Sequence, residues 1–165
     1  MAHKVVVMGV SGSGKSTLAL RLAQALNGSF IEGDDHHLET SRDKMRRGIA
    51  LCDRDREPWL DLLSTRMGGH SGTAVLSCSA LKRSYRARLR SGVDNLRFVF
   101  LEIALPAAVA RVSQRREHEF PASLVEDQFA ALESPEGETN VLCLSAEQAI
   151  EHNLDKAIEW IGTRA

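Results

Sequence analysis

The sequence predicts an α/β fold in which a five-stranded parallel sheet carries helices on both faces. Five short segments rich in apolar and β-branched residues alternate along the chain with segments of helical periodicity, which is the pattern of parallel strands joined by crossover helices. A glycine-rich loop joins the first predicted strand to the first predicted helix, at the edge of the sheet where α/β proteins bind their ligands. The predicted strands are residues 4–9, 29–32, 73–78, 96–102 and 140–144.

The first strand and the first helix have the clearest patterns. "KVVVMG" at residues 4–9 is a continuous β-branched run, as expected for a strand that is buried on both faces. Residues 15–28 place Leu18, Leu22 and Leu26 at helical spacing, and Gly28 is a suitable helix stop. The other predicted helices are residues 35–48, 56–67, 80–90, 106 to about 116, and 146–162.

Length and composition exclude several classes of protein. The chain has 165 residues, which fits a single domain spanning residues 1–165. A net charge of −1 provides no field that would attract nucleic acid or an anionic membrane, so neither partner is expected. Cys52, Cys78 and Cys143 are far apart and form no CxxC motif, which indicates a reduced protein of the cytoplasm. The apolar run at the N-terminus is too short for a signal peptide or a membrane span.

The segment "GVSGSGKS" fits the phosphate-loop pattern G-x-x-x-x-G-K-[ST] at every fixed position. Glycines let backbone N–H groups turn toward phosphate oxygens, and the helix that begins near Lys15 adds its positive dipole end. Lys15 can reach the β- and γ-phosphates of ATP, and the Ser16 hydroxyl can ligate Mg²⁺. The loop therefore predicts a P-loop NTPase-type three-layer sandwich that uses ATP and Mg²⁺. The predicted phosphate-binding residues are Gly9, Ser11, Gly12, Ser13, Gly14, Lys15, Ser16 and Thr17.

Other motifs narrow the choice among P-loop proteins. No aspartate is followed by glycine three residues later, and the chain has no Asn-Lys pair, so the elements by which a GTPase binds its nucleotide are missing. Motors and helicases are normally larger and end a core strand with an aspartate, whereas the third predicted strand runs into "SCSALK". Compact kinases of small molecules or nucleotides remain.

The segment "FIEGDDHH" ends the second predicted strand and should open into the same crevice as the phosphate loop. Phosphoryl transfer to an alcohol needs an acceptor for the hydroxyl proton, and Asp34 is the candidate for this catalytic role. Glu32 or Asp35 could hold Mg²⁺ through water, while helix capping is a further role for the aspartates. A zinc site at His36 and His37 is disfavoured because adjacent histidines diverge on a helix and no Cys–His set completes it. His37 is a candidate for the wall of the acceptor pocket.

Several blocks together resemble the gluconate kinase family. They occur in that family's order from residue 8 to about 135, and the "DRDREPWL" and "CSALK" blocks are more specific than the phosphate loop. The resemblance implies transfer of the ATP γ-phosphate to the 6-hydroxyl of D-gluconate, a fold related to shikimate and nucleoside monophosphate kinases, a mobile lid, and often a homodimer. The blocks are "MGVSGSGKST", "EGDDHH", "KMRRG", "DRDREPWL", "CSALKRSYR" and "RREHEFP…QFAALESP".

Gluconate carries a carboxylate, so its site needs cations. Lys82 and Arg86 are four residues apart on the predicted helix 80–90 and would share one face. Together with Arg56 they are the candidates for binding the carboxylate, which arginine can do with two parallel hydrogen bonds. Arg88 and Arg90 are expected on a solvated face of the same helix.

The lid is expected at about residues 113–125. Arg111 and Arg115 are four residues apart on the preceding helix, and both are predicted to contact ATP. Arg115, with Arg116, could fold over the triphosphate and neutralise the charge of the moving phosphate, which makes Arg115 a catalytic candidate. His118 matches a histidine of the family's lid.

The chain also departs from the family pattern, mainly between the acidic cluster and "DRDREPWL". That segment should form the acceptor side, so another sugar acid or a shikimate-like alcohol remains an alternative acceptor. A nucleotide-binding regulatory protein without turnover is a third alternative. The departures are Leu38, Ser41, Ala50 and Cys52, with Glu119 in the lid.

Overall fold

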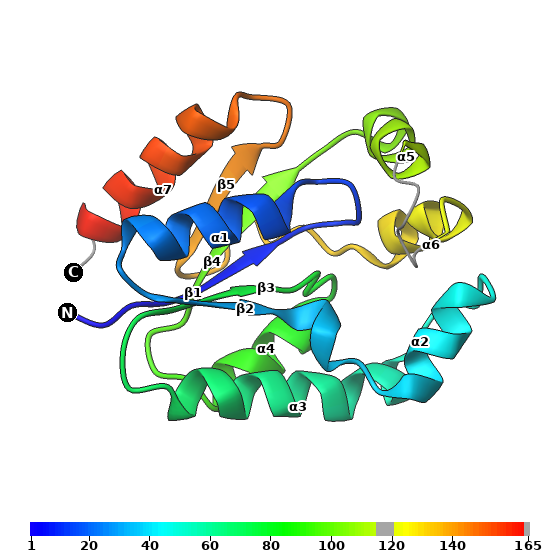
Figure 1. Ribbon diagram of the computed structural model, residues 1–165, viewed down its shortest axis with the longest axis horizontal. Helices are drawn as coiled ribbons and strands as arrows, with labels where there is room; N and C mark the ends of the chain where they lie inside the picture. Colours follow the sequence, from blue (N-terminus) through cyan, green and yellow to red (C-terminus); the bar gives the residue numbers. More distant parts are fainter. Residues whose placement is uncertain (115–120, 164–165) are drawn as a thin grey trace.

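The computed structural model describes residues 1–114 and 121–163. Its centre is a five-stranded parallel sheet with the strand order β2-β3-β1-β4-β5 (Figure 1). Strand β1 lies in the middle, and its residues Val5–Met8 are fully buried because both neighbouring strands and both helical layers cover them. The strands are β1 (Lys4–Met8), β2 (Ser29–Glu32), β3 (Ala74–Ser77), β4 (Arg97–Glu102) and β5 (Val141–Ser145).

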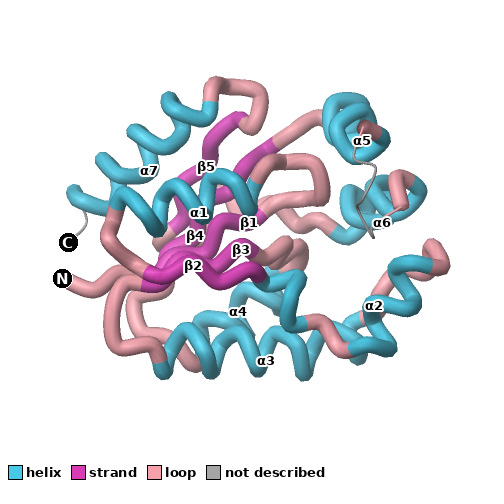
Figure 2. The backbone as a smooth tube through the Cα atoms, in the orientation of Figure 1, coloured by secondary structure: helices cyan, strands magenta, loops and turns pink. Residues whose placement is uncertain are grey.

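Helices cover both faces of the sheet. Helix α1 (Lys15–Ala25) and helix α7 (Ile150–Thr163) pack side by side on one face, and α3 (Asp53–Gly69) and α4 (Arg83–Ser91) cover the other (Figures 1 and 2). The predicted α/β sandwich of the P-loop type is confirmed in its strands, its parallel pairing and its two helical layers.

Three short helices gather beyond the carboxyl ends of the strands. They are α2 (Glu39–Arg46), α5 (Leu105–Ser113) and α6 (Ser123–Ala131). In Figure 1, α5 and α6 lie together at the upper right, with α2 below them at the same end of the molecule. No helix among residues 1–114 and 121–163 is both long enough and apolar enough to cross a membrane.

The structure corrects several predicted boundaries. The helix expected at residues 35–48 is divided into a 3₁₀ turn, η1 (Gly33–His36), and α2, because His37 and Leu38 adopt extended backbone angles. Helix α3 begins at Asp53, three residues earlier than expected, because the Asp55 carboxylate accepts the Cys52 N–H at 3.0 Å and caps the first turn.

Helix boundaries in the second half of the chain also differ from the prediction. The helix expected at residues 80–90 begins only at Arg83, since Ala80 has a positive φ of 46° that no α-helix accepts. The last helix begins at Ile150 rather than residue 146. Helix α6 was not predicted at all, because its nine residues follow a proline and partly overlap the expected lid.

Candidate active site

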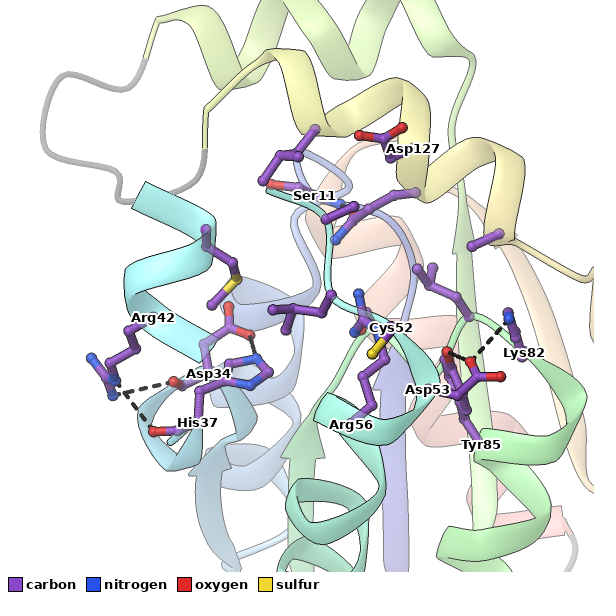
Figure 3. Close-up of a pocket in the computed structure, with 18 of the residues that line it drawn as sticks. Ser11, Asp34, His37, Arg42, Cys52, Asp53, Arg56, Lys82, Tyr85 and Asp127 are labelled. Carbon is purple, nitrogen blue, oxygen red and sulfur yellow. Dashed lines mark hydrogen bonds and ion pairs between the residues drawn. The ribbon is translucent and has the colours of Figure 1, made fainter. Parts of the chain in front are cut away.

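A cavity of about 590 Å³ opens beside the phosphate loop at the carboxyl ends of the strands. Its walls come from that loop, from η1 and from the first turns of α3 and α4, while α6 forms a roof opposite α3 (Figure 3). Acidic and basic side chains alternate around it, which suits a polar ligand with hydroxyl and anionic groups. The charged residues that line it are Lys15, Asp34, Asp35, Arg42, Asp53, Arg56, Lys82 and Asp127.

The phosphate loop has the backbone geometry that anion binding requires. Gly12 and Gly14 have φ angles of 87° and 85°, a region that L side chains rarely adopt. A Cβ at Gly12 would also come within 2.8 Å of the Ala108 carbonyl oxygen on α5. Helix α1 begins at Lys15, so its free N–H groups and positive dipole end face the cavity that Lys15 lines. The residues predicted to bind phosphate thus lie in one loop-to-helix turn.

Glu32 and Ser16 lie together next to this loop. Glu32 ends β2 in register with Ser77 of β3, and the Ser77 Oγ is 3.0 Å from the Ser16 Oγ. Burial raises the pKa of Glu32, against the hydrogen bond from Ser16, which favours the carboxylate. One carboxylate oxygen of Glu32 is buried and has no hydrogen-bond partner among the described residues. This set of oxygen atoms fits Mg²⁺, and Asp35 lines the cavity from η1 as a further oxygen donor.

Asp34 is presented by a tightly packed turn. A Cβ at the preceding residue, Gly33, would lie 2.4 Å from the Ser77 carbonyl oxygen, so only glycine fits there. The Trp59 indole N–H donates to the Gly33 carbonyl at 2.8 Å, and the His37 ring stacks on Trp59 with centroids 4.0 Å apart. The His37 Nε2 is 3.6 Å from the Asp34 carboxylate. Asp34 and His37 therefore line the cavity as a pair whose backbone is fixed by the core.

Arg42 of α2 forms hydrogen bonds with the backbone of the same turn. Its guanidinium donates to the carbonyl oxygens of Asp35 at 2.9 Å and Asp34 at 3.3 Å (Figure 3). These bonds satisfy carbonyl groups at the end of the short 3₁₀ turn. Arg42 was not predicted as a site residue, because nothing in its local sequence distinguishes it from other basic residues of α2.

Arg56 and Lys82 both line the cavity, but only Lys82 has an ion-pair partner among the described residues. The Lys82 ammonium lies 3.0 Å from the Asp53 carboxylate, which also accepts a hydrogen bond from the Tyr85 hydroxyl. The Tyr85 hydrogen bond, followed by the one from Lys82, lowers the pKa of Asp53. Arg56 is only 9% exposed, and the described residues offer its guanidinium no hydrogen bond or ion pair, only the Tyr85 ring 5.7 Å away. Of these two cations, Arg56 is thus the one whose charge is available to a ligand.

The prediction for Arg86 was wrong. Lys82 precedes α4 as its N-cap residue, so the two side chains do not share a helical face. Arg86 is fully buried, and its guanidinium lies 2.7 Å from the Glu138 carboxylate and donates to the Ala80 and Glu133 carbonyl oxygens at 2.7 and 2.9 Å. Arg86 does not line the cavity, because these bonds tie it to the segment after α6.

The other two arginines of α4 also have partners. Arg88 is partly exposed, with 40% of its side chain accessible, and its guanidinium lies 2.8 Å from the Asp61 carboxylate. Arg90 is less exposed than expected, because its guanidinium pairs with Glu138 at 3.1 Å and lies over the Phe98 ring.

A second hollow lies behind the phosphate loop, between α1 and the segment joining β5 to α7. It has a volume of about 270 Å³ and is lined by Gly14, Thr17, Arg111 and Asn153, among others. Arg111 donates to the Gly12 carbonyl at 3.2 Å and to the Ala146 carbonyl at 3.0 Å, so it joins the two walls. The side chain of Arg111 therefore lies beside the phosphate loop, and its contact with ATP stays a prediction.

The remaining lid predictions lie outside the described residues; these are Arg115, Arg116, His118 and Glu119.

Two of the four departures from the family pattern line the cavity. Ala50 and Cys52 form part of its wall, whereas Leu38 is 53% exposed and Ser41 is buried in α2. Part of the altered segment therefore borders the cavity.

Comparison with known proteins finds relatives along nearly the whole chain. The family model described as an AAA domain matches residues 5–135. A gluconokinase of Gluconobacter oxydans is 41% identical over 159 residues, which covers 93% of this chain and 88% of that protein. The thermoresistant gluconokinase of Escherichia coli is 37% identical over 163 residues, covering 96% and 93% of the two chains. The chain belongs to the gluconokinase family.

Solved structures of a gluconokinase and a sugar kinase are similar to this chain in fold and sequence. A crystal structure of a gluconokinase from Sinorhizobium meliloti has a TM-score of 0.90 at 39% identity, over 99% of this chain and 93% of that one. A sugar kinase from Janibacter has a TM-score of 0.93 at 38% identity, over 98% and 95%. Shikimate kinase from Aquifex aeolicus shares the fold, with a TM-score of 0.67 at 15% identity over 98% and 97%. The family and the fold relation expected from the sequence blocks are confirmed.

Proposed function

We propose that this protein transfers the γ-phosphate of ATP to the 6-hydroxyl of D-gluconate and forms 6-phosphogluconate. One observation carries the proposal: a single cavity joins a phosphate loop and an aspartate to a buried arginine without an ion-pair partner among the described residues. Such a cavity matches a molecule with hydroxyl groups and one carboxylate. The relatives are named gluconokinases, and their similarity covers 96% and 93% of this chain.

On the donor side, the loop N–H groups and Lys15 bind the β- and γ-phosphates of ATP. The adenine ring of ATP lies in the hollow beside Arg111. Ser16 and Glu32, with Asp35 acting through water, would hold Mg²⁺. The metal, when bound, neutralises charge on the phosphate oxygens. Lys15 is only 9% exposed, so its positive charge attracts phosphate more strongly than it would in bulk solvent.

On the acceptor side, Asp34 orients the 6-hydroxyl and accepts its proton. The hydroxyl oxygen forms a bond to the γ-phosphorus, the bond from that phosphorus to the bridging oxygen breaks, and ADP leaves with the electron pair. The proton from the hydroxyl moves to the Asp34 carboxylate. Because η1 is fixed by Trp59 and Arg42, Asp34 needs little reorganisation to serve as the base.

The carboxylate of gluconate pairs with Arg56. Lys82 is the less favourable partner, because Asp53 already neutralises its charge at 3.0 Å. Arg56 can form two parallel hydrogen bonds with a carboxylate, and burial makes each of them stronger than it would be in water. Asp53 and Lys82 remain available for the hydroxyl groups in the middle of the acceptor.

A panel of acceptors tests this proposal. ADP release is measured by a coupled assay with gluconate, other sugar acids, shikimate, sorbitol and 6-deoxygluconate, and the product is assigned by phosphorus NMR. Gluconate should give the highest kcat/KM. Sorbitol should be poor because it lacks the carboxylate, and 6-deoxygluconate should be inert. A higher kcat/KM for another acid contradicts the acceptor assignment, and ATP binding without acceptor-dependent ADP release contradicts the kinase assignment.

A further inference from the structure

Helix α6 contacts the phosphate loop through one buried side chain. The backbone N–H of Ser11 donates a hydrogen bond to the Oε1 of Gln128 at 2.6 Å, across 117 residues of sequence. Both residues are largely buried, with exposed fractions of 6% and 9%, so water competes weakly for this bond. Neither the phosphate-loop motif nor the acidic cluster assigns a role to Gln128.

The Ser11 N–H belongs to the surface that binds phosphate. Ser11 stands between Gly9 and Gly12 in the loop and lines the cavity. N–H groups of such a loop donate to phosphate oxygens when a nucleotide is bound. In the structure this donor is bound by the amide oxygen of Gln128, which carries no negative charge. A phosphate oxygen and Gln128 therefore compete for the same hydrogen.

The same helix forms the roof of the acceptor cavity. Leu124 and Ala131 of α6 line the cavity on either side of Gln128 in sequence, and Asp127 points toward it (Figure 3). Leu124 and Gln128 are one helical turn apart, so a shift of Gln128 moves the roof with it. Occupation of the phosphate loop and the shape of the acceptor cavity are thus connected through one hydrogen bond.

We propose that Gln128 is a positioning residue whose amide oxygen accepts the Ser11 N–H until a phosphate oxygen of ATP displaces it, and that this displacement shifts the α6 roof over the acceptor cavity. This inference rests on the proposed kinase function. It requires that the two ligands affect one another's affinity, because a ligand that displaces Gln128 changes the wall that the other ligand contacts.

Two substitutions at Gln128 should change nucleotide affinity in opposite directions. Gln128→Leu removes the competing acceptor and leaves the Ser11 N–H without a partner, so a non-hydrolysable ATP analogue should bind up to about fivefold more tightly, the worth of one net hydrogen bond. Gln128→Glu keeps an acceptor at the same position and adds a negative charge that repels the triphosphate. The analogue should therefore bind at least about tenfold more weakly to that variant.

Isothermal titration calorimetry measures both ligands, separately and together. In the wild-type protein the Kd of gluconate should change when the analogue is bound, and in Gln128→Leu that change should disappear. Gln24→Leu makes the same chemical change at an exposed position of α1 and should behave as the wild type. Unfolding midpoints of all variants show whether the fold is retained.

Equal weakening of the analogue in Gln128→Leu and Gln128→Glu, together with lowered unfolding midpoints, would show that Gln128 merely holds α6 in place, and would overturn the inference. Wild-type-like binding and ligand coupling in Gln128→Leu would overturn it as well. Binding of the ATP analogue can be measured without turnover. The effect of the analogue on acceptor affinity is measured with whichever acceptor the ADP-release assay identifies. Failure of this inference is therefore distinct from failure of the gluconate assignment, which the turnover panel decides.

Discussion

Replacing Arg86 with methionine should destabilise the protein and leave acceptor binding unchanged. Arg86 is fully buried, and its guanidinium pairs with the Glu138 carboxylate, which is also largely buried, with N···O distances of 2.7 and 3.1 Å. It also donates to three backbone carbonyl oxygens, those of Ala80, Leu81 and Glu133. Methionine has a similar volume but supplies none of these hydrogen bonds.

The size of the loss follows from what remains in the structure. Breaking a buried ion pair by removing one partner costs about 3–5 kcal/mol, because the other charge stays buried. Arg90 still pairs with Glu138 at 3.1 Å and compensates part of that charge, so the expected loss is near the lower end, about 3 kcal/mol. Proteins of this kind have a free energy of unfolding of only about 5–15 kcal/mol, so the change is easily measured.

Urea unfolding and steady-state kinetics together test this reasoning. Arg88→Met is the matched control on the same helix, since its ion pair with Asp61 is exposed and should contribute little. The double variant Arg86→Met, Glu138→Gln should recover part of the loss, because it no longer buries an unpaired charge. Unchanged stability in Arg86→Met combined with a tenfold or larger rise in the KM for gluconate would refute the structural role.

Three further predictions concern the cavity and its border. Asp34→Asn should lower kcat by about 10²–10⁴-fold, the contribution of a general base, with ATP affinity retained in a titration; unchanged kcat would remove the base assignment. Arg56→Met should raise the KM for gluconate by about 10–100-fold and leave the KM for ATP within about twofold, and equal effects on both substrates would contradict a carboxylate-binding role. The Cys52 N–H, followed by Lys44, lowers the pKa of Asp55 from 3.8 to about 2 in the folded protein, so its stabilising effect is complete above about pH 4 and is lost as the pH falls toward 2. Urea unfolding of Asp55→Asn should therefore show a weaker loss of stability over that interval than the wild type, and parallel pH profiles would show that Asp55 contributes nothing there.

Motifs that are contiguous in sequence predicted a phosphate loop and an acidic turn, and residues of both line one cavity. The phosphate loop is identified from consecutive residues because glycine torsions and a helix N-terminus are local properties of the backbone. The placement of Asp34 beside that loop followed from a general property of parallel sheets, whose strands end at the same edge. Ser11, Lys15 and Ser16 of the loop line the same cavity as Asp34 in the structure.

Helical spacing alone led to a wrong prediction for Lys82 and Arg86, which were expected to share one helical face. Lys82 and Arg86 appeared equivalent because they are four residues apart, yet a positive φ at Ala80 delays the start of α4 and leaves Lys82 outside it. The side chains of α4 are then directed by packing against the segment around Glu138, 52 residues later in the chain. No local pattern contains that information.

The sequence by itself determined the fold class, the family and the phosphate-binding end of the site, because each depends on local backbone chemistry or on runs of buried apolar residues. Only the tertiary structure decided which charges are available to a ligand. Arg56 is left without an ion-pair partner among the described residues, Lys82 is neutralised by Asp53, and Arg86 is taken by Glu138. The physical reason is that the free charge of a side chain depends on neighbours brought together by folding, and these lie far away in the sequence.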